Sequence, residues 1–186
     1  MQTEQEIAII EGCRKGDSSC QRRLYDTYGP MIKGLCQRYL SDEQEAEDMC
    51  HDIFVFILTH FEHYDNVTSL GGWLRVISVN KLIDHLRKSK LYAVTPMSQL
   101  THEPGVEGDV RYDGIPMQVL QKMIDSLPLK YRTAFNLYVV DEVDQEEIAR
   151  LMGETQTNVR SLVSRAKKKL REKIEKYLRN EEYRYT

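Results

Sequence analysis

The sequence is poor in residues that interrupt helices or mark a membrane protein. It has ten glycines and five prolines among 186 residues and no low-complexity tract. No apolar run approaches the roughly 20 residues that a helix needs to cross a bilayer. The first residues lack the basic and then apolar pattern of a secretory signal. We therefore expect a cytoplasmic protein without direct membrane insertion.

Cysteine is also scarce. The four cysteines lie in the first third of the chain, form no C-x-x-C pair and follow no zinc-binding spacing. Disulfides are uncommon in a reducing compartment. We interpret Cys13, Cys20, Cys36 and Cys50 as small apolar side chains on helix faces. The sequence predicts no metal site and no cofactor.

Apolar residues recur at helical spacing along almost the whole chain, and no segment alternates as a half-buried strand does. This pattern predicts an all-α fold, with helices at about 4–15, 18–39, 42–62, 69–89, 115–126, 128–141, 145–152 and 156–181. The segment 91–114 contains two prolines and three glycines and has little periodicity, which is typical of a flexible linker. We expect two small helical domains, 1–90 and 115–186, joined by this linker.

Charge is distributed unevenly along the chain. The segment 41–65 holds eight acidic residues and no lysine or arginine, whereas 155–180 holds nine basic residues and only two acidic ones. The net charge of −3 therefore averages two opposite surfaces. This pattern favours a protein-binding end and a phosphate-binding end.

The predicted helix 42–62 is apolar on more than one side. One stripe, expected to face the core, consists of Ala46, Met49, Cys50, Ile53, Ile57 and Phe61. A second group, Phe54, Val55, Phe56 and Leu58, extends the apolar surface around the helix. Deep burial and docking of a partner both explain this second group.

The segment 144–170 carries the local signals of a helix-turn-helix. Asp144 can cap a helix, with Glu147 closing a capping box, and Gly153 can supply a left-handed turn. Thr155 can cap the second helix. The residues expected to pack inward are Ile148, Ala149, Leu151, Val159 and Leu162 or Val163.

The outward side of this second helix is suited to DNA. Its residues are Thr157, Asn158, Arg160, Ser161, Ser164, Arg165 and Lys168. Such side chains contact bases and phosphates in the major groove, and the run Lys167–Lys169 would add salt-sensitive backbone contacts. A solvated helix face explains the charges alone, but not their coincidence with the caps and the turn glycine. We therefore predict DNA binding here.

Motifs in both halves of the chain form one pattern. The C-terminal motifs are Leu127-Pro128, Tyr131-Arg132, Glu147-Ile148-Ala149, Val159-Arg160-Ser161 and Arg165–Leu170. The N-terminal motifs are Lys15-Gly16-Asp17, Ala46–Phe54, and Trp73–Ile77 with Asn80, Asp84 and Arg87. In this order they resemble region two and region four of bacterial sigma factors, most closely those of the extracytoplasmic-function (ECF) subfamily.

The resemblance implies a transcription initiation factor that binds core RNA polymerase and promoter DNA. It implies docking on the beta-prime clamp helices by Asp48, His51, Asp52, Phe54 and Leu58, and contact with the beta flap. The minus-ten element would be bound by Tyr64, Asp65 and Asn66, in a loop that captures a flipped base, and by Asn80, Lys81, Asp84, Arg87 and Lys88. The outward helix-turn-helix residues would read the minus-thirty-five element. Trp73 is expected in the core, and the subfamily implies an anti-sigma factor, often membrane-bound.

Two other classes of protein share part of these features. A helix-turn-helix repressor or activator that binds DNA without core polymerase would share the C-terminal motif, but would not require the acidic helix or the segment 73–87. An enzyme would need more than the dipeptide His51-Asp52, and no glycine-rich phosphate loop, nucleophile elbow or ligand set accompanies it. We therefore predict no catalytic residues.

Overall fold

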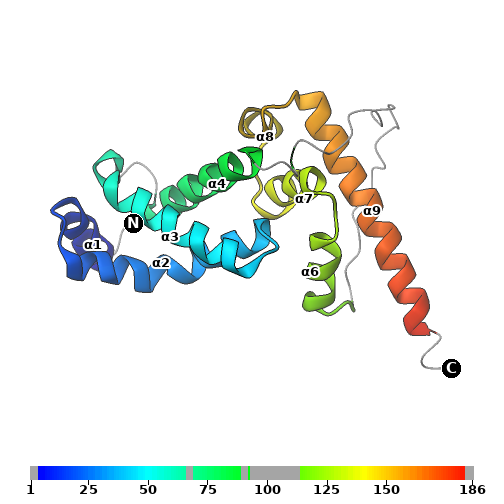
Figure 1. Cartoon of the computed structure of the whole chain (residues 1–186), viewed down its shortest axis with the longest axis horizontal. Helices are drawn as coiled ribbons and strands as arrows, with labels where there is room; N and C mark the ends of the chain where they lie inside the picture. Colours follow the sequence, from blue (N-terminus) through cyan, green and yellow to red (C-terminus); the bar gives the residue numbers. More distant parts are fainter. Residues whose placement is uncertain (1–3, 66–68, 89–91, 93–113, 183–186) are drawn as a thin grey trace. The chain divides into compact units, whose positions relative to one another are not determined.

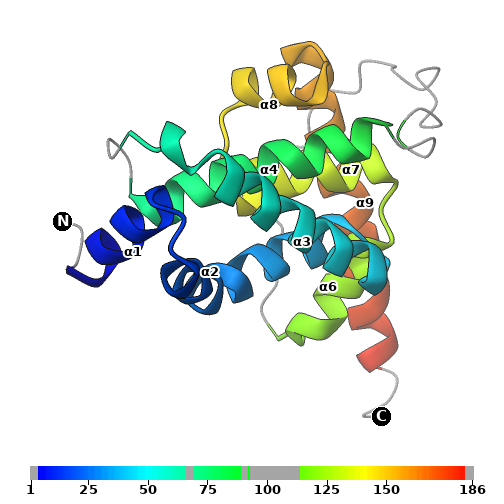
Figure 2. The same ribbon diagram turned by 60° about the vertical axis from the view of Figure 1, so that its left-hand side comes forward.

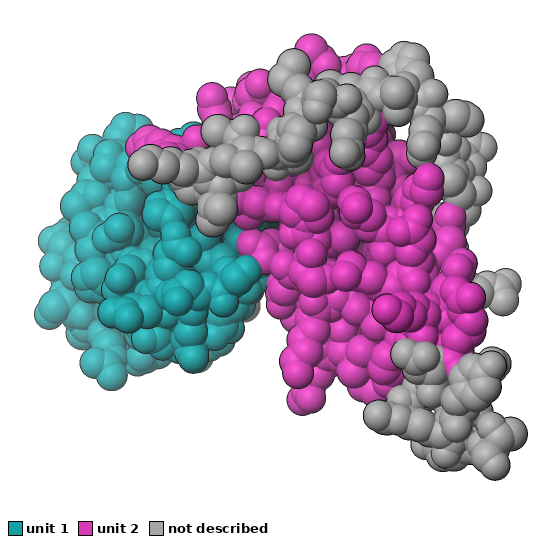
Figure 3. All heavy atoms as spheres, turned by 45° about the vertical axis from the view of Figure 1, so that its right-hand side comes forward, with its two compact units in different colours: residues 1–85 teal, residues 86–186 magenta. Residues whose placement is uncertain are grey.

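The computed structural model describes residues 4–65, 69–88, 92 and 114–182 (Figure 1). The chain divides into two compact units, Met1–His85 and Leu86–Thr186, which Figure 3 distinguishes by colour. None of the described residues lies in a strand, so the all-α prediction is confirmed for that part of the chain. The predicted boundaries 1–90, 91–114 and 115–186 stay a prediction, and almost all of the predicted linker lies outside the described residues.

The first unit is built from α1 (Glu4–Arg14), α2 (Ser18–Tyr39), α3 (Glu43–Thr59), the short 3-10 helix η1 (Phe61–His63) and α4 (Leu70–Lys88) as far as His85. Two aspartates set helix starts: Asp17 accepts a hydrogen bond from the Cys20 amide at 2.9 Å, and Asp42 accepts one from the Glu45 amide at 2.8 Å. Only residues 40–42 separate α2 from α3, and the two helices pack against each other.

The core of this unit comes from the inward stripes of its helices, and α3 lies alongside α4 (Figures 1 and 2). Its fully enclosed apolar side chains include Leu24, Ile32, Ile53, Ile57, Leu70, Leu74 and Leu82. Removing this apolar surface from water is the main stabilising contribution to the fold. The core consequently fixes which face of α3 is left for solvent.

The second unit contains α6 (Met117–Asp125), α7 (Leu129–Phe135), the π-helical segment η3 (Asn136–Val140), α8 (Gln145–Met152) and α9 (Gln156–Glu182). Arg132, only 6% exposed, joins two of these helices because its Nη1 donates to the Asp125 carbonyl at 3.2 Å. Burial lowers the pKa of Arg132, and the carboxylate of Asp125 opposes that shift. Arg132, the second residue of the motif Tyr131-Arg132, therefore has a structural role.

Two predicted helices differ from the structure in their details. The helix expected over 42–62 ends at Thr59 and continues only as the 3-10 turn η1. The helix expected over 128–141 changes to π geometry, in which the Asp141 amide donates to the Asn136 carbonyl at 2.9 Å. An i to i+5 hydrogen bond of this kind leaves no trace in apolar periodicity.

Candidate functional site

The exposed face of α3 is acidic, with one apolar side chain beside the carboxylates. Asp48, His51 and Asp52 are exposed, and their spacing places them on one side of the helix. Val55, one turn farther along, is 49% exposed. Val55 belongs to the second apolar group of this helix, for which both burial and partner docking were expected explanations, and its exposure favours docking for this residue. A surface of carboxylates with an apolar contact suits a basic, partly apolar partner.

Phe54, predicted as a docking contact, belongs to the core. It is 4% exposed, and its ring lies against Tyr25 of α2 with a centroid separation of 4.8 Å. The predicted direct contact through Phe54 is therefore wrong, because packing against α2 turns this side chain inward. Leu58 is half-buried, so it offers only part of its surface.

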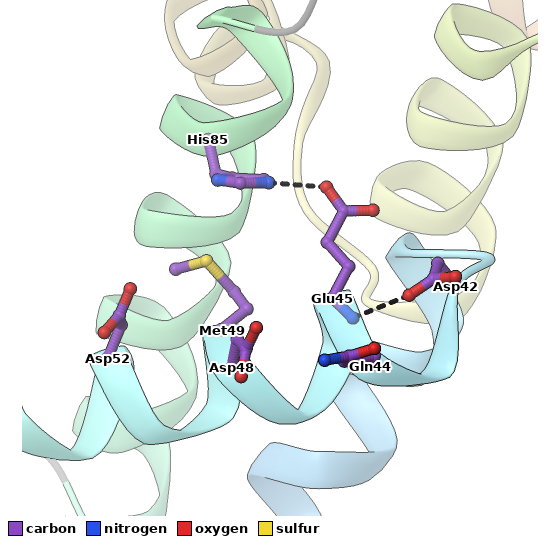
Figure 4. A pocket seen from close by; sticks show the side chains of 7 residues that line it. All are labelled: Asp42, Gln44, Glu45, Asp48, Met49, Asp52 and His85. Atoms are coloured by element: carbon purple, nitrogen blue, oxygen red, sulfur yellow. Dashed lines mark hydrogen bonds and ion pairs between the residues drawn. The ribbon is translucent and has the colours of Figure 1, made fainter.

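A hollow of about 340 Å³ lies between α3 and α4 in the first unit (Figure 4). Its lining side chains are Asp42, Gln44, Glu45, Asp48, Met49, Asp52 and His85. Nε2 of His85 lies 2.8 Å from Oε1 of Glu45, which connects the two helices across the hollow. Because most of the polar lining is carboxylate, the hollow adds to the negative character of the α3 face.

Tyr64 completes an aromatic cluster instead of facing DNA. It is 1% exposed, and its ring centroid lies 5.1 Å from that of Trp73 and 6.2 Å from that of Phe61. Arg14 also donates a hydrogen bond to the Tyr64 carbonyl. The predicted base contact by the Tyr64 ring is therefore wrong, because both neighbouring rings cover it. Trp73 packs on this cluster, as expected for a core contact.

The other two residues predicted in that loop have different outcomes. Asp65 is exposed. Asn66 lies outside the described residues. Among the described residues of this loop, Asp65 is therefore the predicted base-capture residue that is exposed.

The predicted DNA-facing residues of α4 fall into two groups. Asp84, Arg87 and Lys88 are exposed, whereas Asn80 and Lys81 are half-buried. Nζ of Lys81 lies 3.5 Å from the centroid of the Phe56 ring, a cation–π contact that holds its charge against α3. The Phe56 ring also stacks on the His60 ring, with ring centroids 4.0 Å apart.

Sequence reasoning missed Phe56 and His60 as a pair. Their i, i+4 spacing on α3 was the available signal, since residues at that spacing are neighbours on a helix surface. Because Phe56 and His60 are only half-buried and Lys81 is cationic, the three side chains form a partly exposed, positively charged aromatic surface.

The helix-turn-helix has the predicted turn but not the predicted capping box. Asp144 accepts hydrogen bonds from the amides of Glu146 and Glu147 at 2.9 and 3.0 Å. The Glu147 carboxylate pairs with Arg150 instead of closing the box. That hydrogen bond lowers the pKa of Glu147. The available signal was Arg150, three residues after Glu147, because side chains at this spacing on a helix can form an ion pair.

The turn and the second cap follow the prediction. Gly153 has φ +66°, the left-handed conformation that glycine adopts without steric cost. Thr155 Oγ1 accepts a hydrogen bond from the Asn158 amide at 3.2 Å. The inward side chains Ile148, Ala149, Val159, Leu162 and Val163 are all buried, and Leu151 is half-buried. Met152, at 2% exposure, is a core residue that the sequence reasoning did not include.

On the outward side of α9, most of the side chains predicted to contact DNA are exposed or half-buried. Thr157, Arg160 and Lys168 are exposed, and Ser161, Ser164 and Arg165 are half-buried. Nε of Arg160 donates to Oε1 of Gln145 at 2.7 Å, so the first residue of α8 orients this guanidinium. A hydrogen bond of this kind reduces the rotamer freedom of Arg160, so that less side-chain entropy is lost when it contacts a base.

Asn158 is the exception on this helix. Its Nδ2 donates to Glu154, and its Oδ1 is buried without a hydrogen-bond partner among the described residues. The same Glu154 carboxylate accepts from Nζ of Lys130 at 2.9 Å. In this structure the Asn158 amide is engaged by Glu154, and the predicted base contact by Asn158 stays a prediction.

The described residues contain no group of three or more His, Cys, Asp or Glu side chains that could hold a metal ion. Within the same ranges, no helix combines the length and the apolar character needed to span a bilayer.

Two family models match this chain, one in each half. The model for sigma-70 region 2 matches residues 24–91, and the model for sigma-70 region 4 matches residues 117–170. The ECF RNA polymerase sigma factor SigW of Bacillus subtilis is 27% identical over 176 residues, covering 89% of this chain and 94% of the relative. The ECF RNA polymerase sigma-E factor of Escherichia coli is 24% identical over 184 residues, covering 92% and 95%.

Solved structures support the same fold. The sigma factor RpoE from Bartonella quintana, solved in complex with the anti-sigma factor NepR, matches with a TM-score of 0.54 and 21% identity. That match covers 83% of this chain and 96% of RpoE. CnrH, solved with the cytosolic domain of CnrY, matches with a TM-score of 0.53 and 17% identity over 92% of this chain and 98% of CnrH.

Regions two and four in this order define a transcription initiation factor with a DNA-binding helix-turn-helix. The chain belongs to the sigma-70 family of RNA polymerase sigma factors, in its ECF subfamily. It therefore directs RNA polymerase to promoters. A repressor that shared only the helix-turn-helix would not account for the region 2 match, so that alternative is not favoured.

Proposed function

We propose that this sigma factor divides initiation between two oppositely charged helical surfaces. The acidic face of α3, formed by Asp48, His51, Asp52 and Val55, docks on the beta-prime clamp helices of core RNA polymerase. The exposed carboxylates beside an apolar side chain are the observation that carries this proposal. Carboxylates at the rim steer a basic partner and fix its orientation, while Val55 contributes apolar burial.

Minus-ten recognition is assigned to α4 and to the loop before it. Arg87 and Lys88 are exposed at the C-terminal end of α4 and supply positive charge for phosphates. The stacked pair Phe56 and His60, with Lys81, offers a half-exposed surface on which an unpaired base can stack. Asp65, and Asn66 outside the described residues, remain candidates for capturing the flipped base.

Minus-thirty-five recognition is assigned to the N-terminal half of α9. Arg160, oriented by Gln145, and Arg165 are the candidates for bidentate contacts with guanine. Thr157, Ser161 and Ser164 complete the base-facing side, and Lys168 contacts the phosphate backbone. Contact of this unit with the beta flap is proposed from the resemblance alone.

An anti-sigma factor is the further partner that we propose. The solved relatives RpoE and CnrH were each captured with another protein, the anti-sigma factor NepR and the cytosolic domain of CnrY. A partner of this kind would cover the polymerase-binding surface until a signal releases it. We also propose that the chain acts in the cytoplasm and has no catalytic activity of its own, leaving RNA synthesis to core polymerase.

Run-off transcription tests the proposed function. Purified core polymerase is assayed with and without the full chain on genomic fragments that include the region upstream of its own gene. New discrete transcripts that require the chain are expected, and their start sites would align both promoter elements. Absence of transcripts, together with tight binding of the chain alone to one DNA site, would move the function to a core-independent regulator.

A further inference from the structure

The N-terminal helix α1 lies outside the residues that the region 2 model matches, yet it is built into the first unit. Its inward side chains are 4% exposed or less; they are Ile9, Ile10 and Cys13. A Cβ atom at Gly12 would lie 2.5 Å from the Cβ atom of Cys20, so α1 approaches α2 more closely there than any other residue would allow. The packing therefore gives α1 a fixed position on α2.

The turn that ends α1 has no role in the proposed function. Gly16 has φ +73°, the left-handed conformation, and its amide donates to the Cys13 carbonyl at 3.1 Å. The Asp17 amide donates to the Gly12 carbonyl at 2.9 Å. These two hydrogen bonds form a Schellman motif, which stops a helix at a defined residue. Arg14, the last residue of α1, consequently has a fixed place on the first unit.

Arg14 reaches from this turn to the loop between η1 and α4. Its Nη2 donates to the main-chain carbonyl of Tyr64, the residue that ends η1. The Tyr64 ring packs against Trp73 and Phe61. A carbonyl at a helix end has no partner within the helix, and a guanidinium is a strong, charge-assisted donor for it. Because both the ring and the main chain of Tyr64 are held, the chain leaves the aromatic cluster toward Asp65 in a defined direction.

Helix α1 also supports the start of α4, where the same loop ends. The Tyr28 hydroxyl on α2 donates to Oε1 of Glu6 on α1 at 2.9 Å. A Cβ atom at Gly71 would lie 3.4 Å from Cε1 of Tyr28, so this ring lies directly beside the first turn of α4. The Ser69 hydroxyl accepts a hydrogen bond from the Gly72 amide at 3.1 Å and caps that turn. Contacts from α1, direct and through Tyr28, therefore reach both ends of the loop.

We propose that α1 positions the loop that captures the flipped minus-ten base, with Arg14 as the positioning residue. This role rests on the proposed function, in which the exposed Asp65 is a candidate for contact with that base. Pulling a base out of the stack costs free energy that contacts with the loop must recover. A loop already held in one geometry loses less entropy when it binds, so more of that contact energy is available. Arg14 touches no base and acts through the Tyr64 carbonyl.

Binding of the holoenzyme to single-stranded minus-ten oligonucleotides tests this role. The non-template strand of a promoter mapped by run-off transcription is used intact and with an abasic site at each position in turn. The ratio of the two dissociation constants measures capture of the base at that position. Because both values come from one preparation, the ratio does not change with the fraction of chain that is folded. The native holoenzyme should give a ratio well above one at the captured base.

Arg14→Met should lower this ratio about tenfold, because a charge-assisted hydrogen bond is lost. Its affinity for core polymerase and its dependence on the minus-thirty-five element should stay native. Arg14→Lys keeps a cationic donor and should retain part of the ratio. Tyr28→Phe loses only the hydroxyl that binds Glu6, and should lower the ratio by a smaller factor. Lys15→Met removes the same charge one residue away, at an exposed site, and should leave the ratio unchanged.

Hydrogen exchange of the free full chain adds a readout that does not depend on DNA. Amides in the peptide 60–65 should exchange faster in Arg14→Met than in the native chain, and not in Lys15→Met. Either a native ratio or native exchange in Arg14→Met would overturn the proposal and leave base capture standing, and so would an equal loss with Lys15→Met. A ratio of one at every position in the native holoenzyme would remove base capture itself, and the role of α1 with it.

Discussion

The exposed face of α3 and the outward face of α9 carry opposite charges on helices of the same chain. On α3, Asp48 and Asp52 lie on the exposed side, and the inward side of the helix is packed in the core. Val55 adds one apolar side chain to the exposed side. On α9, Arg160 and Lys168 extend from a helix whose inner side is closed by Val159 and Leu162. In both helices, burial of one apolar stripe determines which side chains are exposed on the opposite face. The charge of that exposed face then determines which partner it binds.

The two faces differ in how rigidly their charges are held. Gln145 fixes Arg160 at 2.7 Å, and a left-handed glycine at position 153 fixes the angle between the two helices that present it. The acidic side chains of α3 stand around an open hollow instead. A guanidinium group held in one orientation, such as that of Arg160, suits recognition of base edges. An open acidic surface suits the binding of basic side chains from another protein.

Reversing the charge on α3 is the strongest way to break this comparison. Asp48→Lys/Asp52→Lys should weaken binding to core polymerase by about 100-fold or more, because like charges would then face a basic partner. Fluorescence anisotropy with labelled chain measures the affinity. Glu11→Lys, which changes an exposed acid on α1, is the matched control and should bind normally. Unchanged affinity in the double variant would remove the docking assignment.

A pair of truncations on α3 separates packing from docking. Ile53→Ala should lower the free energy of unfolding by about 2–5 kcal/mol, because Ile53 is fully buried. Val55→Ala should change it by less than about 0.5 kcal/mol and yet weaken polymerase binding. Urea denaturation gives the first quantity and anisotropy the second. Equal losses of stability in both variants would mean that the two sides of α3 are not distinct.

Removing one guanidinium sharpens the α9 side of the comparison. Arg160→Ala should cost about 1–3 kcal/mol in recognition of the minus-thirty-five element, the usual value of a lost bidentate base contact. Arg179→Ala, on the same helix but far from the proposed reading end, serves as control. Transcription from promoters with intact and scrambled elements measures the difference. An equal response to both variants would indicate nonspecific charge and not base reading.

The smallest expected effect concerns the cap of α8. Asp144→Ala should destabilise the second unit by about 0.5–2 kcal/mol, because two backbone amides lose their acceptor. Glu146→Ala, an exposed neighbour whose side chain is not the cap, should cost less. Thermal unfolding compares them. If the two variants melted alike, the cap would not be what starts this helix.

The helix-turn-helix was predictable because its signals are local. Asp144, Gly153 and Thr155 act on residues within a few positions of themselves, and the structure has each in its expected role. The failures there come from competition between near neighbours. Arg150 takes the Glu147 carboxylate from the expected capping box, and Glu154 accepts a hydrogen bond from the Asn158 amide that was expected to face DNA.

The α3 face was harder to predict because its apolar run is continuous. From Ile53 to Leu58 every residue is apolar, so periodicity cannot say which side chains point inward. The neighbour Tyr25 on α2 decides that Phe54 is buried while Val55 is exposed. Tyr64 was misassigned for the same reason, because its partner Trp73 comes from α4. Contacts between distant segments, not local pattern, settle such positions.

Transcription with purified components tests the division of labour most directly. Native chain, Asp48→Lys/Asp52→Lys and Arg160→Ala are compared with core polymerase on promoters that do and do not require the minus-thirty-five element. We predict that the charge reversal on α3 abolishes initiation on every promoter, whereas Arg160→Ala reduces it only where that element is required. Normal initiation by the charge-reversed chain, or a uniform loss with Arg160→Ala, would contradict the account.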